Sequence, residues 1–225
     1  MTYKITSVMV LEITTQQITM YYGEKFNSIT HLTGAVLSLV GLGALVSVGL
    51  QADDLRMIIG FSAFGITLVL LYTMSTLYHS FRPPRLKKIF RKLDHTAIYL
   101  LIAGSYAPYA LVTLKNSRGT LLLSIICLLA IAGILLDLLL PERIELLQVA
   151  IYLAMGWMAL IDYNSLISSL PEHGMAWLWA GGLAYTGGVG FYLLDDKNPY
   201  FHGIWHIFVM AGSLCTFISI IGYVR

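Results

Sequence analysis

Long apolar segments alternate with short polar connections along most of the chain. Seven of these segments reach the roughly 20 residues that a helix needs to cross a bilayer, and they lie at 30–50, 57–79, 95–114, 119–140, 146–169, 174–194 and 200–223. The connections contain prolines and charged residues typical of loops, such as Pro83-Pro84 and Asp195-Asp196. The pattern predicts an all-α protein, a bundle of seven transmembrane helices.

Two of the predicted helices are irregular. Asp162 and Asn164 interrupt the apolar run at 146–169 and make it the weakest of the seven. The run at 174–194 contains five glycines, which predict close packing on a neighbouring helix or a local kink: Gly181, Gly182, Gly187, Gly188 and Gly190. Asp137 is a further polar residue in an apolar run, and for Asp137 and Asp162 the sequence indicates no role beyond hydrogen bonds between helices.

Composition supports a membrane protein. Of the 225 residues, 57% are hydrophobic and only 12% are charged, whereas about 25% of a soluble domain is charged. The net charge is +2 and the basic residues are not arranged as a nucleic-acid surface, so nucleic-acid partners are excluded. Cys127 and Cys215 lie inside apolar runs, and we interpret them as small buried hydrophobic residues, not as a disulfide or a metal site.

The pattern divides the chain into an N-terminal cytoplasmic or interfacial arm, residues 1–28, and a transmembrane domain, residues 29–225. Glu12 interrupts the apolar stretch of the arm and no small-residue cleavage site follows, so the arm is not a convincing secretory signal. Lysine and arginine in the short loops set the orientation. Ten of them fall on the side of the N-terminus and four on the other, which predicts a cytoplasmic N-terminus and an external C-terminus.

The histidines cluster by predicted depth. Five of them fall at the cytoplasmic ends of the spans: His31, His79, His95, His202 and His206. Histidine tolerates a membrane interface, and this interpretation suffices for His95 and for His173 in an external loop. The role of His31 remains undecided. Glu24, Asn27 and His31 share one helical face, and they either form a site or cap and solvate the start of the helix.

His202 and His206 are harder to explain as interfacial residues. Asn198 and Pro199 are typical of an N-cap followed by proline at the first helical position. Side chains at i and i+4 share a face about 6 Å apart along the axis, so both imidazoles can reach one ion. The glutamate of helical His-Glu-x-x-His zinc enzymes is absent, and the isolated spacing is a weak signal.

Three residues on other helices lie at the same predicted depth. His79 offers a third imidazole, Ser75 stands one turn deeper on its helix, and Asp94 begins the next span. Simpler roles exist, since Asp94 fits an N-cap and Ser75 could bond the carbonyl of Leu71. Three histidine ligands with an open fourth position are nevertheless typical of catalytic zinc.

These residues stand in segments that resemble one known family. The segments are "EKFNSITHLTGA" (24–35), "STLYHS" (75–80), "KLDHTAIYLLIAGSYAPY" (92–109) and "FHGIWHIFVMAGS" (201–213). Over nearly all of its length the chain resembles the hemolysin III family of bacterial membrane proteins. That family is related to the progestin and adipoQ receptors and, more distantly, to the alkaline ceramidases.

The resemblance implies a seven-helix fold with a zinc ion near the cytoplasmic side. It assigns metal binding to His79 of the S-x-x-x-H motif and to His202 and His206 of the H-x-x-x-H motif. It also implies that Asp94 meets the zinc through water and that Ser75 helps to stabilise a tetrahedral intermediate.

The leading hypothesis is a zinc-dependent hydrolase of the bacterial cytoplasmic membrane that cleaves a lipid amide such as that of a ceramide. The main alternative is a membrane sensor or receptor in which zinc is structural. A haemolytic pore is a third reading, but no continuous polar face lines several helices. The expected partner is a membrane lipid, as substrate or ligand, and the sequence leaves both a monomer and a homo-oligomer open.

Overall fold

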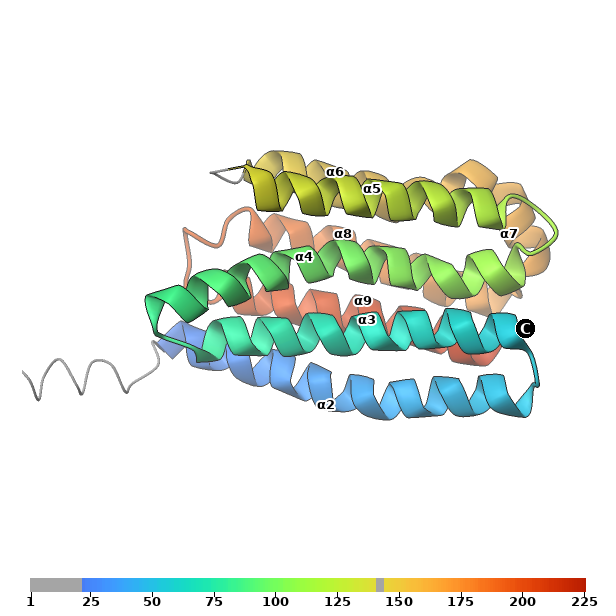
Figure 1. The fold of residues 1–225 in the computed structure, drawn as a ribbon, viewed down its shortest axis with the longest axis horizontal. Helices are drawn as coiled ribbons and strands as arrows, with labels where there is room; N and C mark the ends of the chain where they lie inside the picture. The colour runs from blue at the N-terminus through green and yellow to red at the C-terminus, as the bar shows by residue number, and fades with distance from the viewer. Residues whose placement is uncertain (1–21, 141–143) are drawn as a thin grey trace, which may run out of the picture.

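The structure is a computed structural model that describes residues 22–140 and 144–225, and in these residues it is a bundle of helices without strands (Figure 1). The helices are α2 (Tyr22–Gln51), α3 (Leu55–Ser80), α4 (Pro84–Pro108), α5 (Gly119–Leu139), α6 (Glu145–Trp157), α7 (Tyr163–Ser169), α8 (Glu172–Tyr192) and α9 (Phe201–Tyr223). The π-helix η1 (Tyr109–Thr113) continues α4, and the 3-10 helix η2 (Met158–Asp162) joins α6 to α7.

Six helical segments of the described chain are long and apolar enough to cross a membrane. They are α2, α3, α4 with η1, α5, α6 with η2 and α7, and α9. The remaining predicted span corresponds to α8, which has 21 residues but is rich in Gly, Trp and Tyr, so its hydropathy is lower. All seven predicted helical segments are therefore present, and six of them qualify as membrane spans.

The helices alternate in direction. Figure 1 shows that α2, α4 and α9 begin at one end of the bundle, where α3 also ends. We call this end the histidine end, because the candidate ligands lie there. The chain finishes at the opposite end (Figure 1).

Helix α3 lies between α2 and α4, and α8 packs along α9. Phe61, Phe64 and Tyr99 are fully buried inside the bundle. Most exposed large side chains are Leu, Ile and Val, as expected of a surface that faces lipid. A Cβ atom at Gly181 of α8 would come within 2.9 Å of the Thr216 hydroxyl on α9. The glycines therefore allow the close helix packing that the sequence predicted.

The fifth predicted span is broken where its polar residues stand. The α-helical hydrogen bonding of α6 ends at Trp157, and five residues of 3-10 helix follow up to Asp162. Asp137, the other polar residue of interest, accepts a hydrogen bond from the Gln148 side chain at 2.8 Å, which links α5 to α6. This is the helix–helix bond that the sequence indicated.

Two helix starts differ from the sequence prediction. Helix α4 begins at Pro84 rather than at 95, because proline fits the first helical turn and the basic residues that follow remain helical. Asp94 therefore lies inside α4, and its interpretation as an N-cap is wrong. Helix α9 begins at Phe201 with Tyr200 as its cap. Asn198 is not that cap, because its side chain accepts a hydrogen bond from the Tyr200 N–H within the preceding turn.

The start of the first predicted helix and the burial of the two cysteines also differ from the sequence predictions. Helix α2 begins at Tyr22, well before the start predicted at residue 30, and the rest of the predicted arm, residues 1–21, lies outside the described residues. Both cysteines are unpaired as predicted, but Cys127 is exposed and Cys215 only partly buried. A bundle in lipid turns apolar residues outward, so an apolar run does not by itself predict burial.

Candidate metal centre

Three histidines from two helices converge at the histidine end of the bundle. His79 comes from the last turn of α3, and His202 and His206 come from the first two turns of α9. One ligand nitrogen from each lies within 4.8 Å of the others. The ring centroids are 5.0 Å apart for both pairs that include His79 and 4.8 Å apart for His202 and His206. The imidazoles therefore form a nearly equilateral triangle.

The hydrogen bonds of these rings are arranged in the same way. In each ring the Nδ1 atom has a hydrogen-bond partner. For His79 the partner is Glu24 Oε2 at 2.5 Å, and for His202 it is Asp195 Oδ2 at 2.8 Å. For His206 it is Thr30 Oγ1 at 3.3 Å. The three Nε2 atoms are buried and have no hydrogen-bond partner among residues 22–140 and 144–225. A carboxylate that accepts from Nδ1–H leaves Nε2 with its lone pair available.

These observations fit a transition metal. Neutral imidazole nitrogen is a preferred ligand of zinc, and three protein ligands leave one coordination position open. Ligand histidines usually donate their other N–H to a carboxylate or carbonyl, as His79 and His202 do here. The same nitrogen ligands suit several divalent metals, so the geometry indicates the class of ion rather than one element.

Glu24 ties the centre to two neighbouring helices. Its second carboxylate oxygen accepts a hydrogen bond from Lys87 Nζ at 2.5 Å, and this ammonium also lies 4.9 Å from the centre of the Tyr78 ring. The carboxylate thus connects α2, α3 and α4 around His79. From the sequence the role of Glu24 was undecided, and its shared face with Asn27 and His31 was the signal that could have assigned it to the site.

A fourth histidine lies directly against the triangle. The His31 ring stacks on His206 with centroids 3.5 Å apart and planes 9° from parallel. The Tyr72 ring meets His31 edge-on at 5.0 Å. The sequence left His31 undecided between a site and a helix cap. Its position nine residues inside α2, fully buried, is incompatible with the cap.

Ser75 and Asp94 are both buried near this centre. Ser75 precedes His79 by one helical turn, and its hydroxyl has no hydrogen-bond partner within the described part of the chain. The alternative bond to the carbonyl of Leu71 is therefore not formed. Asp94 is 6% exposed and, together with His31, lines a cavity between the helices. The structure thus brings the three histidines together. Ser75 lies one turn before His79 on α3, and Asp94 of α4 shares the cavity lining with His31.

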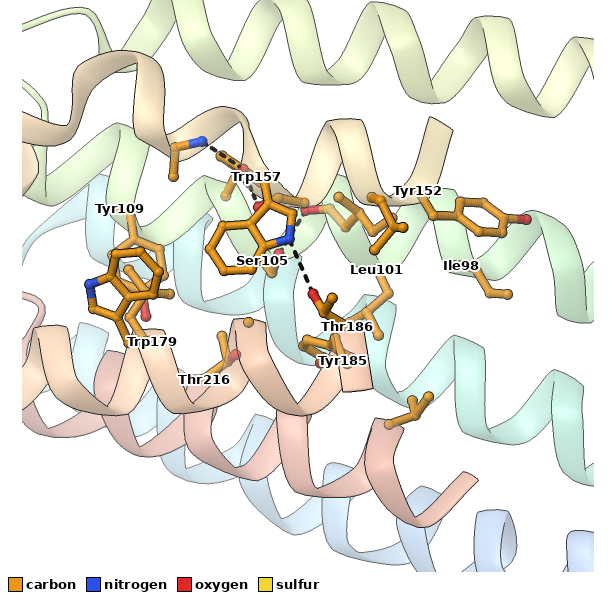
Figure 2. A pocket seen from close by; sticks show the side chains of 18 of the residues that line it. Ile98, Leu101, Ser105, Tyr109, Tyr152, Trp157, Trp179, Tyr185, Thr186 and Thr216 are labelled. Carbon is orange, nitrogen blue, oxygen red and sulfur yellow. Dashed lines mark hydrogen bonds between the residues drawn. The ribbon is translucent and has the colours of Figure 1, made fainter. Parts of the chain in front are cut away.

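The cavity has a volume of about 210 Å³ and runs between the helices toward the opposite end of the bundle. Figure 2 shows part of its lining, which is mostly aromatic and aliphatic. The lining extends from Asp94, in the first half of α4, to Leu114, just after η1. Trp157 is part of this lining and donates a hydrogen bond to the Thr186 hydroxyl at 3.1 Å (Figure 2). A long apolar space therefore begins beside the histidines.

Comparison with known proteins places the chain in a family. Residues 20–217 match the family described as haemolysin-III related. The chain belongs to the hemolysin III family. It is 40% identical over 201 residues to hemolysin-3 of Bacillus cereus, an alignment that covers 89% of this chain and 91% of that protein. It is 39% identical over 200 residues to the hemolysin-3 homolog of Bacillus subtilis (strain 168), covering 89% and 93%.

A more distant relative is the human monocyte to macrophage differentiation factor. It is 28% identical over 207 residues, which cover 90% of this chain and 84% of the human protein. The family resemblance seen in the sequence is thus confirmed, and this match supports the relation of hemolysin III proteins to the progestin and adipoQ receptors. Family membership and the six apolar helices make this hemolysin III protein a multi-pass integral membrane protein.

Proposed function

We propose that this hemolysin III protein is a zinc-dependent membrane hydrolase that cleaves a lipid amide of the ceramide type. One observation carries the proposal. Three buried Nε2 atoms with no hydrogen-bond partner in the described residues converge beside an apolar cavity that Asp94 helps to line. A closed structural site would have four protein ligands, whereas three leave room for water and substrate.

His79, His202 and His206 would hold the ion. Bound zinc supplies Lewis-acid chemistry, in that it acidifies water and polarises a carbonyl. The hydrogen bonds of Glu24 and Asp195 to the histidines keep the rings oriented for this task. Without these carboxylates the imidazoles could rotate or exchange tautomers.

The residues around the histidines supply the rest of the reaction. A water molecule adds its oxygen to the amide carbon, and the Asp94 carboxylate accepts the proton that this water loses. The Ser75 hydroxyl donates a hydrogen bond to the carbonyl oxygen as negative charge develops on it. The C–N bond then breaks, Asp94 returns the proton to the leaving nitrogen, and the products are a carboxylic acid and an amine.

A lipid substrate suits the cavity. Its lining is apolar and aromatic over most of its length, with His31 and Asp94 among the polar residues at the histidine end. An acyl chain placed along this space would leave its amide beside the metal centre. Apolar pockets with few polar groups are typical of sites that bind such ligands.

We further propose that the histidine end faces the cytoplasm. Arg85, Lys88 and Arg91 are exposed on the first turns of α4 at this end, and short loops rich in lysine and arginine remain on the cytoplasmic side. In this orientation a lipid of the inner leaflet would supply the substrate. Cysteine accessibility from each side of spheroplasts tests the orientation.

The function is tested by metal analysis together with an Asp94→Asn variant. Purified wild-type protein should contain one zinc per chain and hydrolyse a short-chain fluorescent ceramide. Asp94→Asn should retain the zinc and lose about 10²–10⁴-fold in turnover, because it removes a proton acceptor while preserving shape. Asp196→Asn, an exposed carboxylate of the α8–α9 connection, is the matched control. Absence of zinc, or full turnover in Asp94→Asn, would contradict the proposal, and bound zinc without turnover would favour a sensor.

A further inference from the structure

His31 lies where the metal centre meets the cavity, and the hydrolase mechanism gives it no role. Its ring is 2% exposed, stacks on His206, and forms part of the cavity lining. Neither Nδ1 nor Nε2 has a hydrogen-bond partner in the described residues. A buried polar group without a hydrogen bond costs free energy. We therefore expect a ligand that enters the site to form the missing hydrogen bond with the His31 imidazole.

His31 lies outside the group of converging ligand nitrogens. The group of nitrogens that converge within 4.8 Å comprises His79, His202 and His206 and does not include it. The nearly parallel stack places His31 beside the His206 ring. The Tyr72 ring packs edge-on against the His31 ring. The Tyr72 hydroxyl donates its hydrogen bond to Ser213, at 2.7 Å, and not to His31. Packing against His206 and Tyr72 therefore holds the ring in place, and neither ring nitrogen has a hydrogen-bond partner among residues 22–140 and 144–225.

The cavity is the side from which a partner can come. A neutral imidazole presents one N–H donor and one nitrogen acceptor. A hydrocarbon chain satisfies neither, whereas a hydroxyl or an amide group can satisfy either. A ligand that lies along the apolar cavity with its polar group toward Asp94 would bring that group to His31.

We propose that His31 is a ligand-binding residue that hydrogen-bonds the hydroxyl or amide head of a lipid held in the cavity beside the metal centre. This inference rests on the proposed function for the class of substrate, but the binding role does not require turnover. His31 selects the lipid by its head group, while the apolar lining accepts the chain. A site that hydrogen-bonds a ligand polar group discriminates against analogues that lack it, because the buried site group is then left unpaired.

The test uses two photoreactive lipids with the same diazirine-bearing acyl chain. One has an N-acyl amino alcohol head, and in the other the amide nitrogen and the hydroxyl are methylated. Zinc-loaded wild-type protein in phosphatidylcholine vesicles should label with the first probe about tenfold better, the factor that one hydrogen bond of ordinary strength supplies. His31→Phe should label equally with both probes and should keep its zinc, because phenylalanine preserves the stack on His206 without offering polar atoms.

Two further variants complete the experiment. His31→Gln, which retains a donor and an acceptor, should keep most of the preference for the N-acyl amino alcohol, and it also serves if His31→Phe does not fold. His173→Phe changes an exposed histidine at the far end of the bundle and should behave as wild type. A retained preference in His31→Phe, or zinc loss from it, would overturn the inference.

Labelling and hydrolysis separate this inference from the proposed function. If wild-type protein shows the head-group preference but never hydrolyses the amide, the proposed hydrolase is wrong and the binding role of His31 stands. If the amide is hydrolysed but the two probes label wild type equally, the hydrolase stands and the role of His31 is refuted.

Discussion

Polar residues interrupt the apolar helices at both ends of the bundle, and the two ends differ in how these residues are paired. At the far end, Asp162 accepts hydrogen bonds from the Ser117 hydroxyl at 2.8 Å, the Ser165 hydroxyl at 2.6 Å and the backbone N–H of Arg118 at 3.3 Å. At the histidine end, hydrogen bonds occupy Nδ1 of His79 and His202 while their Nε2 atoms stay buried without a partner in the described chain.

The contrast separates a structural cluster from a binding site. The Asp162 cluster joins the α4–α5 connection to the start of α7, lies next to solvent and has its acceptors satisfied. It needs no ligand. The histidine cluster leaves lone pairs pointing into a protein interior, an arrangement that costs free energy unless something binds there. The pairing of polar atoms, more than their presence in a membrane helix, therefore indicates function.

The largest effect is expected when one of the three imidazoles is removed. His202→Ala should weaken zinc binding by more than the about 10–100-fold that loss of a hydrogen-bond partner of a ligand typically costs, because a direct ligand disappears. Chelator competition on purified protein measures this change. His202 keeps 22% of its side-chain surface exposed, so its truncation disturbs packing less than truncation of the fully buried His206.

The matched control for that variant is His173→Ala at the opposite end, where the histidine is exposed. Its zinc affinity should equal that of wild type. If His202→Ala bound zinc as tightly as wild type, the histidine end would not be a metal site. The proposed function could then not depend on zinc.

A smaller effect is expected from the partner of His79. Glu24→Gln retains a hydrogen-bonding side chain but removes the charge that holds His79 and Lys87. Zinc affinity should fall by about 10–100-fold, because the imidazole loses its fixed orientation and part of its basicity. Isothermal titration with zinc measures the change, with Asp196→Asn as the carboxylate control. If Glu24→Gln binds zinc within about twofold of wild type, the hydrogen bond is incidental.

Much of the fold could be predicted from the sequence, because membrane helices obey simple length and hydropathy rules. The break at Asp162 and the close packing at Gly181 also followed from local composition. The start of α4 did not. A basic segment after two prolines is equally compatible with a loop and with an interfacial helix, and only packing decides between them. The position of Asp94 inside a helix depended on that choice.

Only part of the candidate site could be predicted from the sequence. The alternating directions of the predicted helices placed His79, His202 and His206 at the same end of the bundle. In the structure, one ring nitrogen of each lies within 4.8 Å of the others. The stack of His31 on His206 could not be predicted, since it depends on the rotation of α2 relative to α9. The pairing of Glu24 with His79 likewise depends on which face of α2 meets α3. Helix count and hydropathy fix neither rotation.

The smallest effect is expected at the far end. Asp162→Asn keeps the size of the side chain but weakens its hydrogen bonds to Ser117 and Ser165 at a solvated connection. We expect a fall in Tm of about 2–4 °C, the shift that a loss of about 1 kcal/mol produces in a chain of this size. Zinc affinity should not change, because no ligand depends on this cluster. Thermal unfolding in detergent and chelator competition on the same sample measure the two quantities. A fall in zinc affinity comparable to that of Glu24→Gln would mean that the two ends are coupled through the helices, and the separation of structural from functional polar clusters would then fail.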